Sequence, residues 1–194
     1  MAPASEDGSF YERDRKNLFV LERLLDLRYN ALQGMTTALV KSPAIDPRYA
    51  SFKLEIRESK IHRRGVYALE RIPARRTVIE YTGERISRRE TKRRGQGPLT
   101  YLFTLDEYWT IDGAVGGSGA EIINHSCGPN LASCIRNGHI LYTSKRAIEP
   151  GEELTVDYRF SEKIEAVRCR CRTANCRGTI NLKQRPVKTS TQCG

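Results

Sequence analysis

The sequence predicts a mostly β domain that is built from several small sheets and preceded by one amphipathic helix. From Phe52 onward, apolar and polar residues alternate in short runs separated by turn residues, a pattern typical of strands. The pair Asn137-Gly138 stands between two such runs and is a strong signal for a two-residue hairpin. The sequence has neither a βαβ rhythm nor a Gly-rich dinucleotide loop, which disfavours a doubly wound α/β fold.

The first predicted element is a helix near the start of the chain. Its leucines recur at helical spacing, at Leu18, Leu21, Leu25 and Leu32. Gly34 is a natural residue to end this helix, and Pro43 and Pro47 mark a linker after it. We expect the helix to cover an apolar flank of the domain, and a partner-binding role is the alternative.

Strands and one short helix follow in order. Before residue 112 the predicted strands are Phe52–Ile56, Gly65–Ala68, Thr77–Tyr81, Tyr101–Phe103 and Trp109–Ile111. Between them, Ser87 and Glu90 have the spacing of a capping box, in which hydroxyl and carboxylate satisfy unpaired backbone amides. A short helix should therefore follow Ser87 and stop near Gly95. Later strands are Leu131–Arg136, His139–Ser144 and, after the turn Pro150-Gly151, Leu154–Val156.

The composition fits one globular domain. A chain of 194 residues with 39% hydrophobic residues suffices for one core but hardly for two full domains. No apolar run approaches the roughly 20 residues that span a bilayer, and the polar, acidic start does not read as a signal peptide. We therefore expect a soluble protein that has no membrane segment and is not secreted.

The chain is strongly basic. Its 33 Lys and Arg residues outnumber its 23 Asp and Glu residues, which gives a formal charge of +10 spread over several faces. Such a field attracts nucleic acid or acidic surfaces and repels basic peptides. We expect most of this charge to be ordinary solvated surface, and weak contact with nucleic acid or an acidic partner is the alternative.

Two polar motifs and a cysteine group carry the chemistry. The motifs are Asn-His-Ser-Cys-Gly-Pro-Asn at residues 124–130 and Glu-Leu-Thr-Val-Asp-Tyr at residues 153–158. The cysteine group is Cys169-Arg170-Cys171 together with Cys176. These residues resemble the SET-domain protein lysine methyltransferases, and the resemblance covers Phe52 to Gly178.

The resemblance implies a SET fold with a pseudoknot-like threading. In that fold the segment of the first motif passes beneath the segment that leads to the second, so that both meet at one active site. The implied parts are a helical extension and linker at residues 1–48, a SET catalytic domain at 49–160, a post-SET zinc-binding segment at 161–180 and a flexible tail at 181–194.

The implied reaction is methyl transfer from S-adenosylmethionine to a lysine amine. This in-line displacement needs alignment of the reacting atoms and an uncharged amine. By resemblance, Tyr158 lies beside the lysine nitrogen and the transferring methyl, and Tyr81 lies across the channel. The alternative for Tyr158 is a structural tyrosine whose hydroxyl bonds to backbone. Because an unperturbed phenol is a poor base at neutral pH, a purely orienting role also stays open.

The resemblance places the cofactor against the first motif and one turn. The implied contacts are Arg63, Arg64, Gly65, Tyr67, Tyr101, Asn124 and His125. Asn124 and His125 would hold the adenine and amino-acid ends, whereas a lone histidine by itself would be structural. Two positions depart from the family's pattern. Arg63 replaces the first glycine of a Gly-x-Gly turn, and Glu121 stands where many relatives have an arginine.

The lysine channel and the number of methyl groups follow from the same resemblance. Phe103 and Phe160 look like channel walls, although either could be plain core packing. The residue two before the catalytic tyrosine tunes methyl number in the family, and here it is Val156. Ser133, at another position that can carry a limiting tyrosine, is also small. We therefore expect a pocket that admits di- or trimethyllysine.

Four cysteines match the family's zinc-binding pattern. They are Cys127, Cys169, Cys171 and Cys176, and four thiolates suit a tetrahedral Zn²⁺ site. Such a site would hold the C-terminal segment over the cofactor, and simple free thiols are the alternative. A chain of this size with six cysteines fits a reducing compartment better than a disulfide framework.

Together the sequence predicts an S-adenosylmethionine-dependent protein lysine N-methyltransferase with a structural zinc ion. Its expected substrate is an exposed lysine in a histone tail or another basic protein. The expected location is the nucleus or chromosome in a eukaryote and the cytoplasm in a bacterium. The alternative function is a non-catalytic SET-like zinc module that binds basic peptides or nucleic acid.

Overall fold

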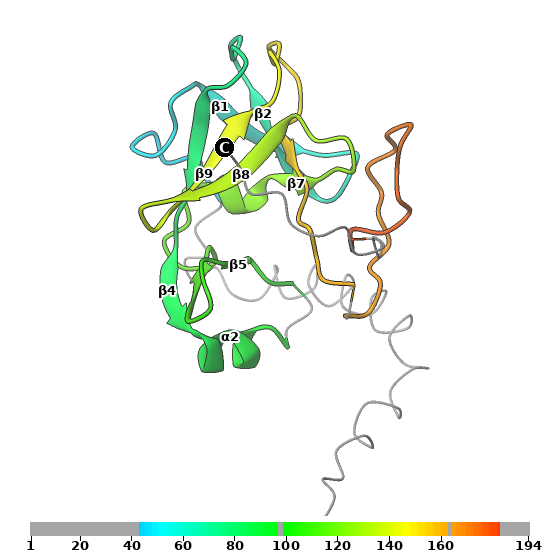
Figure 1. Cartoon of the computed structure of the whole chain (residues 1–194). Helices are drawn as coiled ribbons and strands as arrows, with labels where there is room; N and C mark the ends of the chain where they lie inside the picture. Colours follow the sequence, from blue (N-terminus) through cyan, green and yellow to red (C-terminus); the bar gives the residue numbers. More distant parts are fainter. Residues whose placement is uncertain (1–42, 97–98, 163, 183–194) are drawn as a thin grey trace, which may run out of the picture. The chain divides into compact units, whose positions relative to one another are not determined.

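The computed structural model describes residues 43–96, 99–162 and 164–182 (Figure 1). These residues form short strands with one α-helix and one 3-10 helix, which confirms the predicted mostly β fold class. The predicted amphipathic helix that ends at Gly34 lies outside the described residues, as does the tail beyond Leu182. Within the described part of the chain, no helix has the length and apolar character that crossing a membrane requires.

Four small sheets make up the described fold. The elements are β1 (Leu54–Glu58), β2 (Arg64–Ala68), β3 (Thr77–Tyr81), β4 (Glu84–Ser87), α2 (Arg88–Arg94), β5 (Leu102–Thr104), β6 (Trp109–Asp112), η1 (Ala120–Ile122), β7 (Asn124–His125), β8 (Leu131–Arg136), β9 (His139–Ser144) and β10 (Thr155–Val156). The sheets are ordered β1-β2, β3-β9-β8, β4-β6-β5 and β10-β7. Figure 1 shows β4, β5 and α2 grouped at one end of the domain, apart from β1 and β2.

The β8–β9 hairpin follows directly from its turn residues. Asn137 and Gly138 have φ values of 51° and 80°, the left-handed conformation that these two residue types tolerate best. The tight turn fixes the register, so that Ser133 in β8 lies directly opposite Tyr142 in β9. Cross-strand partners point to the same face of the sheet, and this pair therefore shares one side of the domain.

The helix α2 begins as predicted but lacks half of the predicted capping box. Ser87 Oγ accepts a hydrogen bond from the Glu90 amide, which is the expected N-cap. The Glu90 carboxylate instead pairs with Arg93 and Arg94. The reason is that Ser87 also ends β4, where its backbone pairs with Trp109 of β6.

The core lies between the small sheets. Its buried side chains come from β1, β2, β3, β8, β9, β10 and η1, together with side chains from the connecting segments: Ile72, Leu105, Ile123, Ile148 and Leu154. Ile72 and Ile148 exchange a pair of backbone hydrogen bonds of 2.9 Å, so these connecting segments are themselves fastened together. This core fixes the sheets against one another, and the residues of the short β7–β10 pair are buried with it.

The parallel pair of β7 and β10 brings the two sequence motifs into contact. Asn124 lies beside Thr155 and His125 lies beside Val156. Asn130 reinforces the contact, because its side chain accepts from the Thr155 amide at 2.8 Å and donates to the Glu153 carbonyl at 2.9 Å. Two segments about thirty residues apart therefore meet at one place, as the resemblance implied.

Candidate active site

His125 connects the second motif to a cysteine. Its Nδ1 accepts a hydrogen bond of 3.1 Å from the Tyr158 amide, and its Nε2 lies 3.5 Å from Cys127 Sγ. Burial lowers the pKa of His125 to about 4, so the ring is neutral at pH 7. The hydrogen-bond pattern assigns its proton to Nε2, facing the sulfur. Both ring nitrogens thus face protein atoms, and the imidazole positions Tyr158.

Asn124 fastens the turn that was expected to touch a cofactor. Its Nδ2 donates to the carbonyls of His62 and Arg64, at 3.2 and 2.9 Å, and also faces Ser59 Oγ at 3.1 Å. Among the described residues no donor reaches its Oδ1. The residue is 6% exposed, so an acceptor stands at the edge of the turn without a protein partner.

Glu153 is the centre of this network, and sequence reasoning did not single it out. Its carboxylate accepts from Ser59, Asn124 and Tyr67 at 2.7, 2.9 and 3.0 Å. Gly65 packs so tightly here that a Cβ would overlap the Glu153 carboxylate. The only available signal was its place as the first residue of the second motif.

Arg63 has a backbone conformation that glycine adopts more easily than other residues. Its φ is 45°, in the left-handed region that favours glycine. Tyr67 is less available than expected, because its hydroxyl bonds to Glu153 and to the Glu58 carbonyl while the Arg57 guanidinium lies 3.8 Å above its ring. Tyr67 therefore supports the turn through its hydroxyl, and its expected contact with the cofactor stays a prediction.

The two tyrosines assigned to catalysis both donate to backbone carbonyls. Tyr158 Oη bonds to the Ile123 carbonyl at 3.0 Å, and Tyr81 Oη bonds to the Tyr101 carbonyl at 2.5 Å. Burial of the hydroxyls raises the pKa of both phenols, so both are neutral at physiological pH. The bond expected of a structural tyrosine is thus present at Tyr158, yet the residue is 39% exposed and its ring remains accessible.

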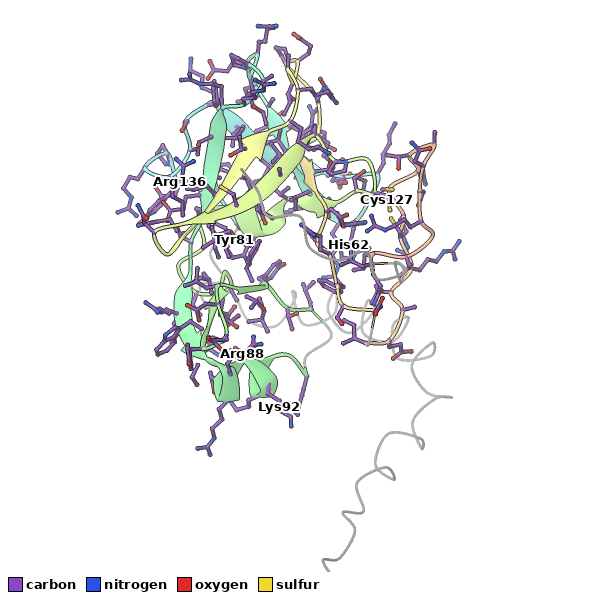
Figure 2. The ribbon with its side chains drawn as sticks, viewed as in Figure 1. His62, Tyr81, Arg88, Lys92, Cys127 and Arg136 are labelled. Atoms are coloured by element: carbon purple, nitrogen blue, oxygen red, sulfur yellow. The ribbon has the colours of Figure 1, made fainter. Side chains whose placement is uncertain are left out.

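Aromatic rings surround these two hydroxyls. Tyr81 lies 5.4 Å from Phe103 and 6.1 Å from Tyr142 between ring centroids, and Phe160 stacks on Tyr158 at 5.7 Å. Figure 2 shows Tyr81 where the chain passes between the two three-stranded sheets. Sequence reasoning missed Tyr142, although its place in an alternating strand opposite Ser133 could have indicated it. Val156 is 2% exposed in β10 and Ser133 is half-buried.

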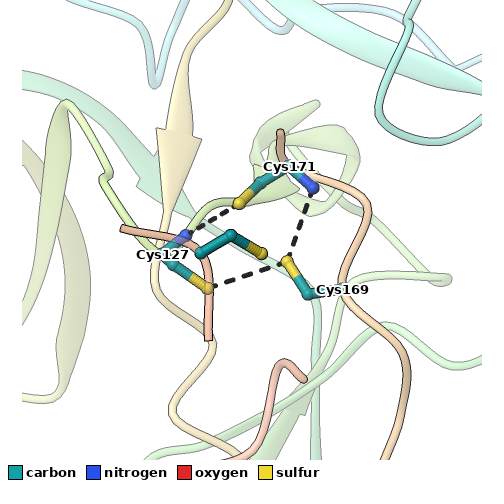
Figure 3. Close-up of side chains that lie close together, drawn as sticks. Cys127, Cys169 and Cys171 are labelled. Atoms are coloured by element: carbon teal, nitrogen blue, oxygen red, sulfur yellow. Dashed lines mark hydrogen bonds between the residues drawn. The ribbon is translucent and has the colours of Figure 1, made fainter. Parts of the chain in front are cut away.

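The four predicted cysteines form one cluster (Figure 3). The sulfur atoms of Cys127, Cys169, Cys171 and Cys176 all lie within 4.8 Å of one another. Cys127 Sγ and Cys169 Sγ are 3.7 Å apart, close to the roughly 3.8 Å edge of a tetrahedron with metal–sulfur bonds of about 2.3 Å. The amides of Arg177 and Gly178 donate to sulfurs of the cluster at 3.3 and 3.4 Å. The donor set therefore fits a metal ion held by thiolates.

The cysteine segment is also tied to the second motif. Arg177 makes two hydrogen bonds to the Asp157 carboxylate, at 2.9 and 2.8 Å, beside Tyr158. Although burial raises the pKa of Asp157, these bonds hold it below its usual range. A movement of the cysteine cluster would therefore be passed by Arg177 to Asp157, which is the residue before Tyr158.

The described residues combine several small sheets, a crossing of two sequence motifs, and aromatic rings and a cysteine cluster near that crossing. The chain belongs to the SET-domain family, because the model of the SET domain matches residues 63–159. The match begins at the turn held by Asn124 and ends just after Tyr158, so it contains the crossing itself.

Several relatives are named as enzymes. The H3 lysine-4 specific histone-lysine N-methyltransferase of Schizosaccharomyces pombe is 36% identical over 80% of this chain. The histone-lysine N-methyltransferase trithorax of Drosophila virilis is 38% identical over 63% of the chain, and human histone-lysine N-methyltransferase SETD1B is 35% identical over 69%. The chain covers only 16%, 3% and 7% of these relatives' lengths.

A solved structure has a similar fold. The crystal structure of KRYPTONITE in complex with mCHG DNA and SAH aligns with a TM-score of 0.58 and 30% identity. The alignment covers 68% of this chain and 29% of that one.

Proposed function

We propose that this chain transfers methyl groups from S-adenosylmethionine to a lysine amine of a basic protein. The observation that carries the proposal is the crossing of β7 and β10, which brings the two sequence motifs together within the region matched by the SET-domain model. Relatives named as histone-lysine N-methyltransferases support the same reaction.

The residues of the chain align and desolvate the amine. Bound S-adenosylmethionine would supply an electrophilic methyl, so that the lysine nitrogen forms a C–N bond as the S–C bond breaks, with S-adenosylhomocysteine leaving and a proton passing to water. The rings of Tyr81, Phe103 and Phe160 would exclude water from the lysine side chain and disfavour its charged form. Because the Tyr158 hydroxyl donates its hydrogen bond to the Ile123 carbonyl, its oxygen lone pairs are left to orient the amine.

The cofactor would lie against the turn at residues 63–65. The unpaired Oδ1 of Asn124 can accept from the cofactor's ammonium group, and the exposed guanidinium groups of Arg63 and Arg64 suit its carboxylate. Tyr101 completes the site from the side of Tyr81, to which its carbonyl is bonded. His125 contributes through its backbone and through its hold on Tyr158.

The metal in the cysteine cluster is proposed to be zinc. Four cysteines are typical of structural zinc sites and leave no position open for catalysis. The ion would hold residues 169–176 against Cys127, and Arg177 would transmit that restraint to Asp157.

The proposed substrate is histone H3, and the proposed product carries more than one methyl group. The substrate follows from relatives that are named H3 lysine-4 specific, and it implies a chromosomal location. The small side chains of Val156 and Ser133 leave room for a methylated amine. The basic chain would not attract a histone tail by its net charge, so we expect the peptide to bind through backbone contacts along a strand edge.

The test is transfer of labelled methyl to a panel of histones and other basic proteins. We expect transfer to histone H3 by the wild-type chain and a loss of about 100-fold or more in Tyr158→Phe, with cofactor binding kept. Tyr108→Phe is the matched control, because Tyr108 is 67% exposed. Cofactor binding without transfer to any protein would favour the non-catalytic alternative, and absence of cofactor binding would contradict the proposal.

We also propose a weaker contact with nucleic acid through α2. Arg88, Arg89 and Lys92 are exposed and make no ion pair among the described residues, and Figure 2 shows Arg88 and Lys92 on this helix. Binding of a DNA duplex should weaken steeply with salt and fall further in the double variant Arg88→Glu, Lys92→Glu. DNA binding that changes neither with the salt concentration nor in the double variant would contradict this contact.

A further inference from the structure

Tyr142 is a buried tyrosine that lies opposite one of the two small residues of the expected channel. It projects from β9 directly opposite Ser133, with its ring 6.1 Å from Tyr81 and 6.3 Å from Phe103 between centroids. The residue is only 3% exposed. A phenol thus joins the aromatic cluster from the strand that neighbours Ser133.

The hydroxyl of Tyr142 has no protein partner in the described part of the chain. The two buried side-chain atoms without a hydrogen bond there are Thr110 Oγ1 and Arg177 Nε, so the Tyr142 hydroxyl is not sealed off and touches accessible space. A buried phenol ordinarily finds a partner, because an unpaired hydroxyl costs about 1–3 kcal/mol. The missing partner must therefore be water or a bound ligand.

The rings that contact Tyr142 are the ones assigned to the lysine channel. Tyr81 and Phe103 lie 6.1 and 6.3 Å from it between centroids, and both are assigned above to walls of that channel. Burial also raises the pKa of Tyr142, so its phenol is neutral at physiological pH.

We propose that the Tyr142 hydroxyl sets the number of methyl groups that the enzyme adds to its lysine, by bonding the partly methylated amine or its water and opposing the last transfer. The inference rests on the proposed function. The Tyr142 hydroxyl can form a hydrogen bond with an amine that still carries an N–H, or with a water beside that amine. A third methyl group would remove this hydrogen-bond partner and would need the volume that the partner occupies. A site built to hydrogen-bond a group discriminates strongly against a molecule that lacks it.

The test measures three successive transfers separately. The probes are histone H3 peptides that start with unmodified, monomethylated or dimethylated lysine 4, each incubated with the full chain and S-adenosylmethionine. We expect the wild-type chain to act well on the first two peptides and poorly on the third. In Tyr142→Phe the rate on the third peptide, relative to the first, should rise by roughly tenfold, the worth of one hydrogen bond. Tyr108→Phe should leave the ratio unchanged.

Each outcome decides the inference. An unchanged ratio in Tyr142→Phe and in the shorter variant Tyr142→Ile would overturn it, as would a wild-type chain that trimethylates freely. Tyr142→Phe should fold as stably as the wild type, because it removes a hydroxyl with no protein partner. Marked destabilisation would therefore show a hidden structural bond and also overturn the inference. No transfer to any of the three peptides by the wild-type chain would instead contradict the proposed function.

Discussion

Glu153 shows how a single carboxylate can hold a binding turn in place. It receives hydrogen bonds from Ser59, Tyr67 and Asn124, which come from three separate segments. Gly65 lies against it with no room for a Cβ. Two of the seven predicted cofactor contacts, Tyr67 and Asn124, are thus bound to the same side chain.

Gly65→Ala should disrupt this network. The added methyl group overlaps the Glu153 carboxylate, so we expect a loss of about 1–3 kcal/mol in the free energy of unfolding and weaker cofactor binding. Gly128→Ala is the matched control, because its nearest neighbour would be an ordinary 3.5 Å contact with Thr173. Chemical unfolding and calorimetric titration with S-adenosylhomocysteine measure both quantities, and equal behaviour of the two variants would refute this role of the network.

Buried phenols should make the fold sensitive to alkali. Burial raises the pKa of Tyr81 and Tyr142 in the folded state above the value of about 10 in the unfolded chain. Their contribution to stability is therefore fully present below pH 10 and is lost as the pH rises above it. Urea unfolding between about pH 8 and 11 should show this fall, with a shallower slope in Tyr81→Phe. Identical slopes in variant and wild type would contradict the assignment.

The C-terminal segment shows an element that is fixed without regular secondary structure. Residues 164–182 contain no strand or helix among those described, and Figure 1 shows them running along the side where β7 lies. Three cysteines and Arg177 hold this segment, supported by Asn181, whose side-chain amide reaches the Ser161 carbonyl at 3.0 Å. The order of this segment therefore depends on polar and metal-binding side chains rather than on a hydrophobic core.

Removing the metal should loosen this segment and reduce activity. We expect the purified chain to contain about one equivalent of zinc, and Cys176→Ser to lower both metal content and thermal stability. Cys134→Ser is the control, because Cys134 is exposed and outside the cluster. Metal analysis and limited proteolysis with and without a chelator give the readout, and a metal-free wild-type chain that resists proteolysis would count against the site.

Sequence patterns predict some elements better than others. The hairpin around Asn137-Gly138 and the helix after Ser87 were predictable, since turn and cap residues act locally. The strands β4 and β7 were not predicted, because four and two residues are too short for an alternation to show. Their existence depends on partners far away in the chain, β6 for the first and β10 for the second.

At the scale of the whole molecule, the site is a product of the crossing rather than of any one motif. The motifs indicated Tyr158, Asn124 and the four cysteines, because each residue type has a recognisable chemistry at that spacing. Tyr142 and Glu153 were missed, because their importance comes from register and from three-dimensional contact. The cofactor contact expected of His125 stays a prediction, and the structure adds that its ring accepts a hydrogen bond from the Tyr158 amide.

The most direct measurement is methyl transfer to two histone H3 peptides that differ only at lysine 4, one of them with arginine in its place. Mass spectrometry should detect methyl groups on the lysine peptide alone, and Tyr158→Phe should abolish them. Equal labelling of both peptides would contradict lysine 4 as the target, and transfer that survives Tyr158→Phe unchanged would contradict a lysine methyltransferase site at the crossing of β7 and β10.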